Sequence, residues 1–270
     1  MAVTRGAIMD LFEYEFMQRA FLVGTLLALI VPCIGVIVVL KRLSMMSDAL
    51  AHNSLAGVAA GLMIGINPIF GAVIMCILSA LAIEVIRKHL PRYSEISIAI
   101  VMSAGIGLAG LLSGLVKSSA NFNSFLFGSI VAISNFELYL VIGISFLVLL
   151  FFCLLYRELY YIALDERSAR LAGIPVNWVN FIFTILTALT VSIAARTVGT
   201  LVVSSLMILP VACALQIGKS YKQVVGLGIV FALLFTSIGL TLSFYGGLKP
   251  GATIVLAGVM GLILILFSKK

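Results

Sequence analysis

The chain has 270 residues, of which 63% are hydrophobic and 10% are charged, and its formal net charge at pH 7 is +7. Soluble domains are roughly half apolar and a quarter charged, so this composition excludes an ordinary soluble protein and indicates a membrane protein. No run of basic residues is longer than two. The positive charge is therefore explained by the inward-facing loops of a membrane protein, with no nucleic-acid partner expected.

Nine apolar segments follow one another along the chain, and each is long enough to cross a hydrocarbon core of roughly 30 Å. They predict an all-α, multi-pass membrane protein with about eight to nine transmembrane helices, in one domain over residues 1–270. The short N-terminal segment 1–16 carries four charged residues, so we expect no cleavable signal peptide there. The segments are about 17–40, 48–66, 68–86, 96–116, 136–156, 178–195, 197–217, 223–245 and 252–268.

The distribution of lysine and arginine predicts the orientation. With the N-terminus outside, twelve of the 17 basic residues fall in inward loops and five on the outer side. This is the bias expected when the C-terminus is inside. Arg196 alone separates the sixth and seventh segments, and we interpret it as a charge at the tip of a hairpin. In the seventh segment, Ser204, Ser205 and Pro210 either line a pathway or mark a proline kink.

Asp48 and His52 stand out near the start of the second segment. Residues four apart share one face of a helix, and charged groups inside a membrane are costly enough to indicate function. A carboxylate and an imidazole together suit Zn²⁺ or Mn²⁺. The alternative is that Asp48 caps the helix. Gly57 and Gly61, a small-xxx-small pair, predict that this helix packs closely in the interior.

Two connections are longer than hairpins need. Residues 117–129 on the outside lead into 130–134, which could form a short re-entrant helix. Residues 157–175 on the inside mix apolar and charged side chains and end at Gly173 and Pro175. They predict a short amphipathic cytoplasmic helix. Its charges have both signs, which favours docking to a protein over lying on lipid.

Enzyme signatures are missing from the sequence. It has no P-loop, no Gly-x-Ser-x-Gly and no His-Glu-x-x-His. An intramembrane enzyme using Asp48 and His52 would need a second carboxylate at the same depth. A secondary transporter driven by an ion gradient would be expected to show internal repeats, and none is convincing.

Three blocks of sequence resemble the membrane permease subunits of bacterial ABC importers for zinc and manganese. Arg42–His52 with Gly57 is similar to the family's Asp-Ala-(Leu/Ile)-(Ala/Ser)-His signature. Phe125–Ser129 is similar to its Tyr-Leu-Phe-Gly block, and Val198–Ala214 to its Val-Gly-x-Leu-Leu block with the later Pro-Ala-Ala. The resemblance covers essentially the whole chain in order. It implies the fold of a type II ABC importer permease in the bacterial cell membrane.

The resemblance also implies the partners and the roles of particular residues. We expect a homodimer or a paired permease, cytoplasmic ABC ATPase subunits that hydrolyse ATP in place of this chain, and an extracytoplasmic metal-binding protein. Residues 157–175 then resemble the coupling helix, with Asp165, Ala169 and Gly173 at matching spacing. No permanently bound cofactor is expected.

The metal is expected to be the transported substrate, with Asp48 and His52 as a step in its path near the inner end of their helix. Ser205–Pro210 and Ala51–His52 resemble the zinc branch of the family more closely, which implies Zn²⁺, with Mn²⁺ or Fe²⁺ as the alternative. Two ligands fall short of the four that a stable zinc site needs. Either two copies share an axis and supply two Asp and two His, or waters and other residues of one chain complete a weak site.

Overall fold

The computed structural model describes residues 14–90, 93–115, 133–200 and 202–268, and within them all regular structure is α-helical. Residues 1–13 of the N-terminal segment, the Phe125–Ser129 block and most of the expected re-entrant helix lie outside this part of the chain. The helices are α2 (Glu15–Leu40), α3 (Met46–Ile64), α4 (Pro68–His89), α5 (Ser94–Leu115), α7 (Asn135–Leu154), α8 (Tyr156–Leu164), α9 (Glu166–Leu171), α10 (Val176–Val198), α11 (Val203–Ile217), α12 (Tyr221–Gly246) and α13 (Pro250–Ser268).

Each of the nine predicted apolar segments forms a helix, which confirms the all-α multi-pass fold. Seven of these helices are long and apolar enough to span a membrane, namely α2, α4, α5, α7, α10, α12 and α13. α11 has only 15 residues. α3 has 19, but Asp48, His52 and Asn53 make its first half polar. α3 and α11, which correspond to the second and seventh predicted segments, are therefore not among the seven helices that meet both criteria.

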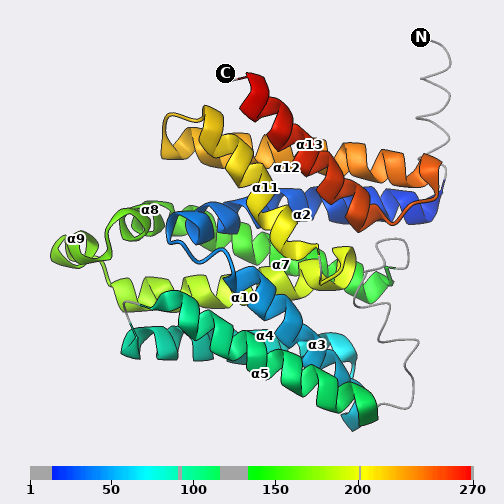
Figure 1. Ribbon diagram of the computed structural model, residues 1–270, viewed down its shortest axis with the longest axis horizontal. Coiled ribbons are helices and arrows are strands. Elements are labelled where there is room, and N and C mark those ends of the chain that lie inside the picture. The colour runs from blue at the N-terminus through cyan, green and yellow to red at the C-terminus, as the bar shows by residue number, and fades with distance from the viewer. Residues whose placement is uncertain (1–13, 91–92, 116–132, 201, 269–270) are drawn as a thin grey trace.

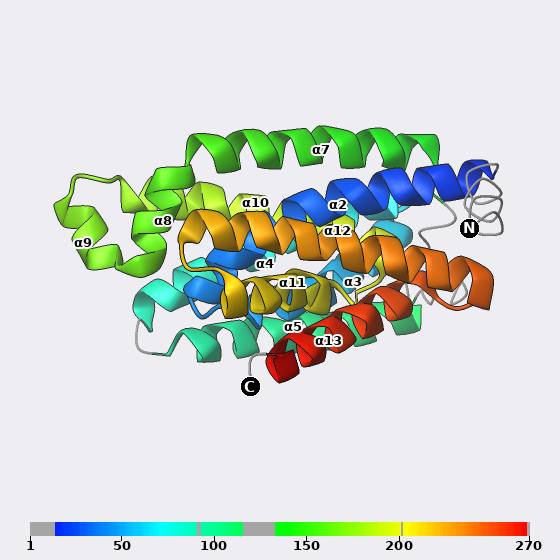
Figure 2. The ribbon, with the colours of Figure 1, turned by 90° about the horizontal axis from the view of Figure 1, so that it is seen from above.

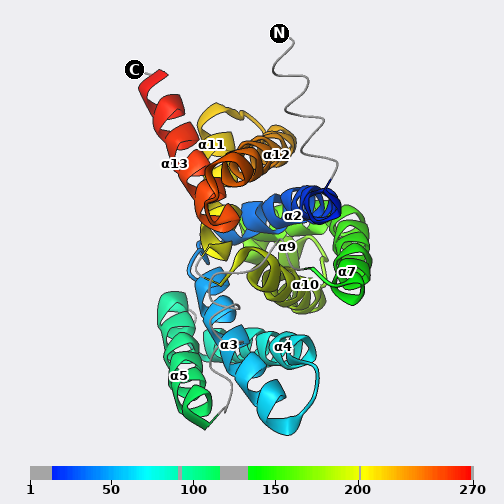
Figure 3. The same ribbon diagram turned by 90° about the vertical axis from the view of Figure 1, so that its right-hand side faces the viewer.

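The helices lie in three groups when the bundle is viewed from one end (Figure 3). α2, α7 and α10 form the middle group, α3, α4 and α5 lie on one side of it, and α11, α12 and α13 on the other. α2 and α10 are the most buried of the long helices. α5 and α13 lie at the flanks and expose most of their apolar side chains, as expected for helices that face lipid.

α3 packs against both of its neighbours through glycine. A Cβ atom built on Gly57 would lie 2.2 Å from the backbone oxygen of Gly71 in α4. A Cβ on Gly105 in α5 would lie 2.3 Å from the side chain of Asn53. The Asn53 amide donates to the carbonyl oxygens of Ala49 at 2.7 Å and Val101 at 3.1 Å. The interior position predicted for α3 is confirmed, and its spacing from α4 and α5 leaves no room for side chains at these glycines.

The segment 157–175 projects from one end of the bundle (Figures 1 and 2). The expectation of a single helix is wrong here, because the chain forms two short helices, α8 and α9, with Asp165 between them. The backbone of Asp165 is extended, and its carboxylate accepts hydrogen bonds from the Arg167 N–H at 2.9 Å and the Ser168 hydroxyl at 2.5 Å. An aspartate that caps the following helix in this way interrupts the preceding one.

Candidate metal path and coupling segment

Asp48 lies in the first turn of α3 and points across to another helix. The Ser204 hydroxyl, at the start of α11, donates a hydrogen bond to Asp48 Oδ1 with a distance of 2.5 Å. α3 begins at Met46 after the N-cap residue Met45, which makes no side-chain capping bond. Asp48 is therefore two residues inside the helix, and the reading of it as the N-cap is wrong.

His52 follows one turn later on the same face of α3, and both side chains are partly exposed. Within the described residues no hydrogen bond holds the His52 ring, while the neighbouring Asn53 and Ser54 are buried and bonded to backbone carbonyls. The imidazole is therefore available to bind an ion. Cys76 is not part of this site, because its buried thiol donates to the Leu50 carbonyl at 3.3 Å.

The start of α11 is set by a buried turn that ends α10. Gly199 has φ +106°, a conformation that favours glycine, and Thr200 is 2% exposed. α11 then begins at the buried Val203, so the start of this helix lies inside the bundle, where the Ser204 hydroxyl reaches Asp48. α10 runs away from the end that bears α8 and α9 (Figure 1). The hydrogen bond from Ser204 thus joins the first turn of α3, which follows the end of α2, to the first turn of α11, which follows the end of α10.

The donor set around Asp48 is small. The described residues contain no group of three or more His, Cys, Asp or Glu side chains that could hold a metal ion. Asp48, His52 and Ser204 offer a carboxylate oxygen, an imidazole nitrogen and a hydroxyl oxygen. A closed structural zinc site takes four ligands, usually with thiolate or imidazole. This set suits an ion that binds weakly and leaves again.

Arg196 does not stand at an exposed hairpin tip, so that interpretation is wrong. It lies in the last turn of α10 and pairs with Glu137 of α7 at 2.8 Å. Glu137 is 7% exposed. Its carboxylate accepts a hydrogen bond from the Ser134 N–H, and its own N–H donates to the Ser134 hydroxyl oxygen, so the two residues form a capping box. This buried pair ties α7 to α10 at the end opposite the coupling segment. Neither residue had a visible partner in the sequence, since they are 59 positions apart.

The three residues predicted to couple to an ATPase have different surroundings. Asp165 caps α9, and the hydrogen bonds from Ser168 and Arg167 hold the pKa of its exposed carboxyl below the usual value. Ala169 is 2% exposed and belongs to the core. Gly173 has φ +84° and ends the segment. Among the large apolar side chains of the segment, Leu171 is the most exposed, at 90%.

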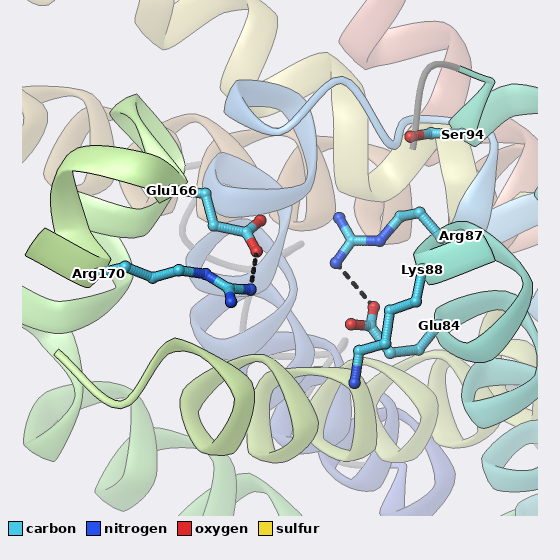
Figure 4. Close-up of a pocket in the computed structure, with 6 residues that line it drawn as sticks. All are labelled: Glu84, Arg87, Lys88, Ser94, Glu166 and Arg170. Atoms are coloured by element: carbon cyan, nitrogen blue, oxygen red, sulfur yellow. Dashed lines mark hydrogen bonds and ion pairs between the residues drawn. The ribbon is translucent and has the colours of Figure 1, made fainter. Parts of the chain in front are cut away.

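A charged cavity of about 240 Å³ separates this segment from the end of α4 (Figure 4). One wall carries the Glu84–Arg87 ion pair at 2.8 Å, and the other the Glu166–Arg170 pair at 3.1 Å. Lys41, directly after α2, donates to the Asn180 side chain at 2.7 Å. Burial and the nearby Arg87 lower the pKa of Lys41 to about 8.

Known proteins resemble this chain over nearly its full length. The family model described as "ABC 3 transport family" matches residues 13–269. A probable metal transport system membrane protein of Treponema pallidum is 34% identical over 258 residues, which cover 95% of this chain and 96% of that protein. The manganese transport system membrane protein MntC of Listeria monocytogenes is 31% identical over 262 residues, which cover 96% of this chain and 93% of that protein.

A solved structure shows the same fold. PsaBC from Streptococcus pneumoniae, in complex with Fab, matches with a TM-score of 0.86 and 26% identity, over 97% of this chain and 95% of that one. The zinc preference expected from the sequence finds no support among these relatives, because none of their names gives zinc and that of the Listeria protein gives manganese. The family explains the absence of nucleotide-binding motifs, since ABC permeases work with separate ATPase subunits. The chain belongs to the ABC 3 transport family and is a multi-pass membrane permease subunit of ABC-type metal transport.

Proposed function

We propose that this chain is the permease of an ATP-driven importer of Mn²⁺, and that Asp48 and His52 bind the ion during its passage. The observation that carries the proposal is the position of Asp48. Its carboxylate is held by Ser204 between the starts of α3 and α11, one turn from a histidine with no partner in the described residues. Manganese in the name of the Listeria relative supports the choice of metal.

The chemistry of the donor set supports manganese as well. Mn²⁺ is a harder cation than Zn²⁺ and accepts carboxylate and hydroxyl oxygens readily, together with imidazole nitrogen. The described residues place no cysteine in a ligand cluster with Asp48 and His52. Zn²⁺ is the second candidate, because the His52 imidazole and a carboxylate are also zinc ligands.

The proposed partners follow from the two ends of the bundle. ATP would be hydrolysed by cytoplasmic ATPase subunits that bind α8 and α9, where Leu171 and Leu164 expose 90% and 62% of their surface. Apolar side chains in this position suit a protein contact. An extracytoplasmic metal-binding protein would deliver the ion at the end held by Glu137 and Arg196. A second permease copy would complete the transporter, with residues 1–270 acting as one domain in each copy.

The Asp48–Ser204 bond bears on how the metal site is completed. Both residues belong to one chain, which favours a weak site completed by residues of the same copy and by water. A site shared between two copies would need Asp48 to face a partner instead of α11.

The test is uptake by the reconstituted complex of permease, ATPase and metal-binding protein, with Mn²⁺ and Zn²⁺ in competition. Asp48→Ala and His52→Ala are each expected to abolish uptake while the ATPase still co-purifies with the permease. His89→Ala is the matched control, because His89 is exposed at the end of α4. Full uptake by both variants would remove the pair from the mechanism, and a preference for Zn²⁺ in the wild type would reject manganese as the cargo.

A further inference from the structure

The Asp48 carboxylate can accept hydrogen bonds either from the backbone N–H groups at the start of its own helix or from the Ser204 hydroxyl of α11. The first turn of α3 leaves backbone N–H groups without acceptors inside the helix, and Met45 offers no side-chain acceptor. A carboxylate at the third helical position commonly turns back to such groups. In that orientation it would stabilise the helix and would not face an ion path.

The structure shows the other orientation. Asp48 Oδ1 accepts the Ser204 hydroxyl at 2.5 Å, from a residue 156 positions away in the sequence. Ser204 is 9% exposed and is the second residue of α11. The carboxylate therefore lies between the first turns of two helices, α3 and α11.

We propose that Ser204 is the positioning residue of the metal site, and the inference rests on the function proposed above. The Ser204 hydroxyl holds Oδ1 and so turns Asp48 away from its own helix end. Oδ2 and the His52 imidazole then face the ion together, since they lie one turn apart on the same side of α3. The hydroxyl oxygen keeps its own lone pairs and adds a hard donor beside the carboxylate, which favours Mn²⁺ over softer ions.

Binding of the ion stays weak because the described residues offer few ligands around Asp48 and His52. A site with one carboxylate and one imidazole binds loosely, which transport requires because the ion has to leave again.

The experiment measures Mn²⁺ binding by electron paramagnetic resonance on the purified permease–ATPase complex, together with the KM for uptake. Ser204→Ala is expected to raise both the Kd and the KM about tenfold, the size of effect that follows from loss of a hydrogen bond to a charged group. Ser204→Thr keeps the hydroxyl and is expected to restore both values to near wild type. Ser192→Ala is the matched control, because Ser192 is also buried and its hydroxyl donates at 2.9 Å to Leu189 of its own helix.

A second variant separates positioning from packing. Ser204→Cys replaces a hard oxygen with a soft sulfur, so the ratio of the Kd for Zn²⁺ to the Kd for Mn²⁺ should fall about tenfold. A residue that only fills space would change both constants alike. An unchanged ratio in Ser204→Cys, or a wild-type Kd in Ser204→Ala, overturns the role of Ser204.

The Asp48→Ala variant distinguishes this inference from the proposed function. If Asp48→Ala has lost Mn²⁺ binding and Ser204→Ala has not, only the role of Ser204 fails. If Asp48→Ala binds and transports Mn²⁺ normally, the metal path through Asp48 is itself wrong.

Discussion

The close contact between α3 and α4 makes Gly57 the most informative position to change. The Cβ of Gly57→Ala would lie 2.2 Å from the Gly71 carbonyl oxygen, which is about 1.2 Å closer than an ordinary contact of 3.4 Å. Backbone lies on both sides of this contact, so no side chain can turn away to make room. The two helices would have to separate by about 1 Å, and overpacking of this kind costs about 1–3 kcal/mol.

The same displacement has a consequence for transport. α3 carries Asp48, and a shift of about 1 Å lengthens the 2.5 Å bond to Ser204 beyond hydrogen-bond range. We therefore expect Gly57→Ala to lower both the melting temperature of the purified complex and the rate of Mn²⁺ uptake.

The assay compares Gly57→Ala with Gly107→Ala. Gly107 lies on the exposed side of α5, and a Cβ there has nothing within 4 Å. Alanine is a better helix former than glycine, so Gly107→Ala should leave stability unchanged or raise it slightly. A Gly57→Ala complex that melts and transports like wild type would refute the argument, because α4 would then not be held against α3 by backbone contact.

Three further predictions concern the ends of the bundle. Arg196→Ala leaves the Glu137 carboxylate buried without its cation and should cost about 3–5 kcal/mol of stability, measured by thermal melting. The double variant Glu137→Gln/Arg196→Met should recover part of this loss. An unshifted melting temperature for Arg196→Ala would contradict a buried pair. The pKa of Lys41 is about 8 in the folded chain, and its ordinary value is 10.5. Between pH 8 and pH 10.5, therefore, Lys41 is protonated in the unfolded chain and deprotonated in the folded chain. Stability should therefore rise with pH across this window by up to about 3 kcal/mol, and Lys41→Met should flatten the rise; an equal rise in both proteins would assign it to another group. Leu171→Asp should lower the amount of ATPase that co-purifies with the permease, because it places a charge at an apolar position of α9 that is 90% exposed. Undiminished recovery of the ATPase would exclude this residue from the docking surface.

The helices could be predicted from the sequence because hydropathy and length are local properties. All nine apolar segments form helices, and the polar first half of α3 is visible as Asp48, His52 and Asn53. Gly57 was also identifiable, since its spacing from Gly61 is typical of close helix packing. Its partner Gly71 was not, because nothing in the sequence says which helix approaches which.

The long-range contacts could not be predicted for the same reason. Ser204 was visible as a serine in an apolar segment, but its bond to Asp48 depends on the buried turn after α10 that places the start of α11 inside the bundle. The pairing of Glu137 with Arg196 depends in the same way on α7 lying beside α10. The break at Asp165 had a local signal, an Asp-x-x-Ser sequence that can cap a helix, but the apolar pattern on both sides favoured one continuous helix.

The two ion pairs that line the cavity of Figure 4 have a mechanical consequence. Each pair joins residues of a single helix, Glu84 with Arg87 and Glu166 with Arg170, and among the described residues no ion pair crosses from α9 to α4. α9 is joined to the bundle by the 3.3 Å hydrogen bond from Arg170 to Asn177 of α10 and by the burial of Ala169, and not by an ion pair to α4. A tilt of α9 relative to α4 would therefore separate no ion pair among the described residues.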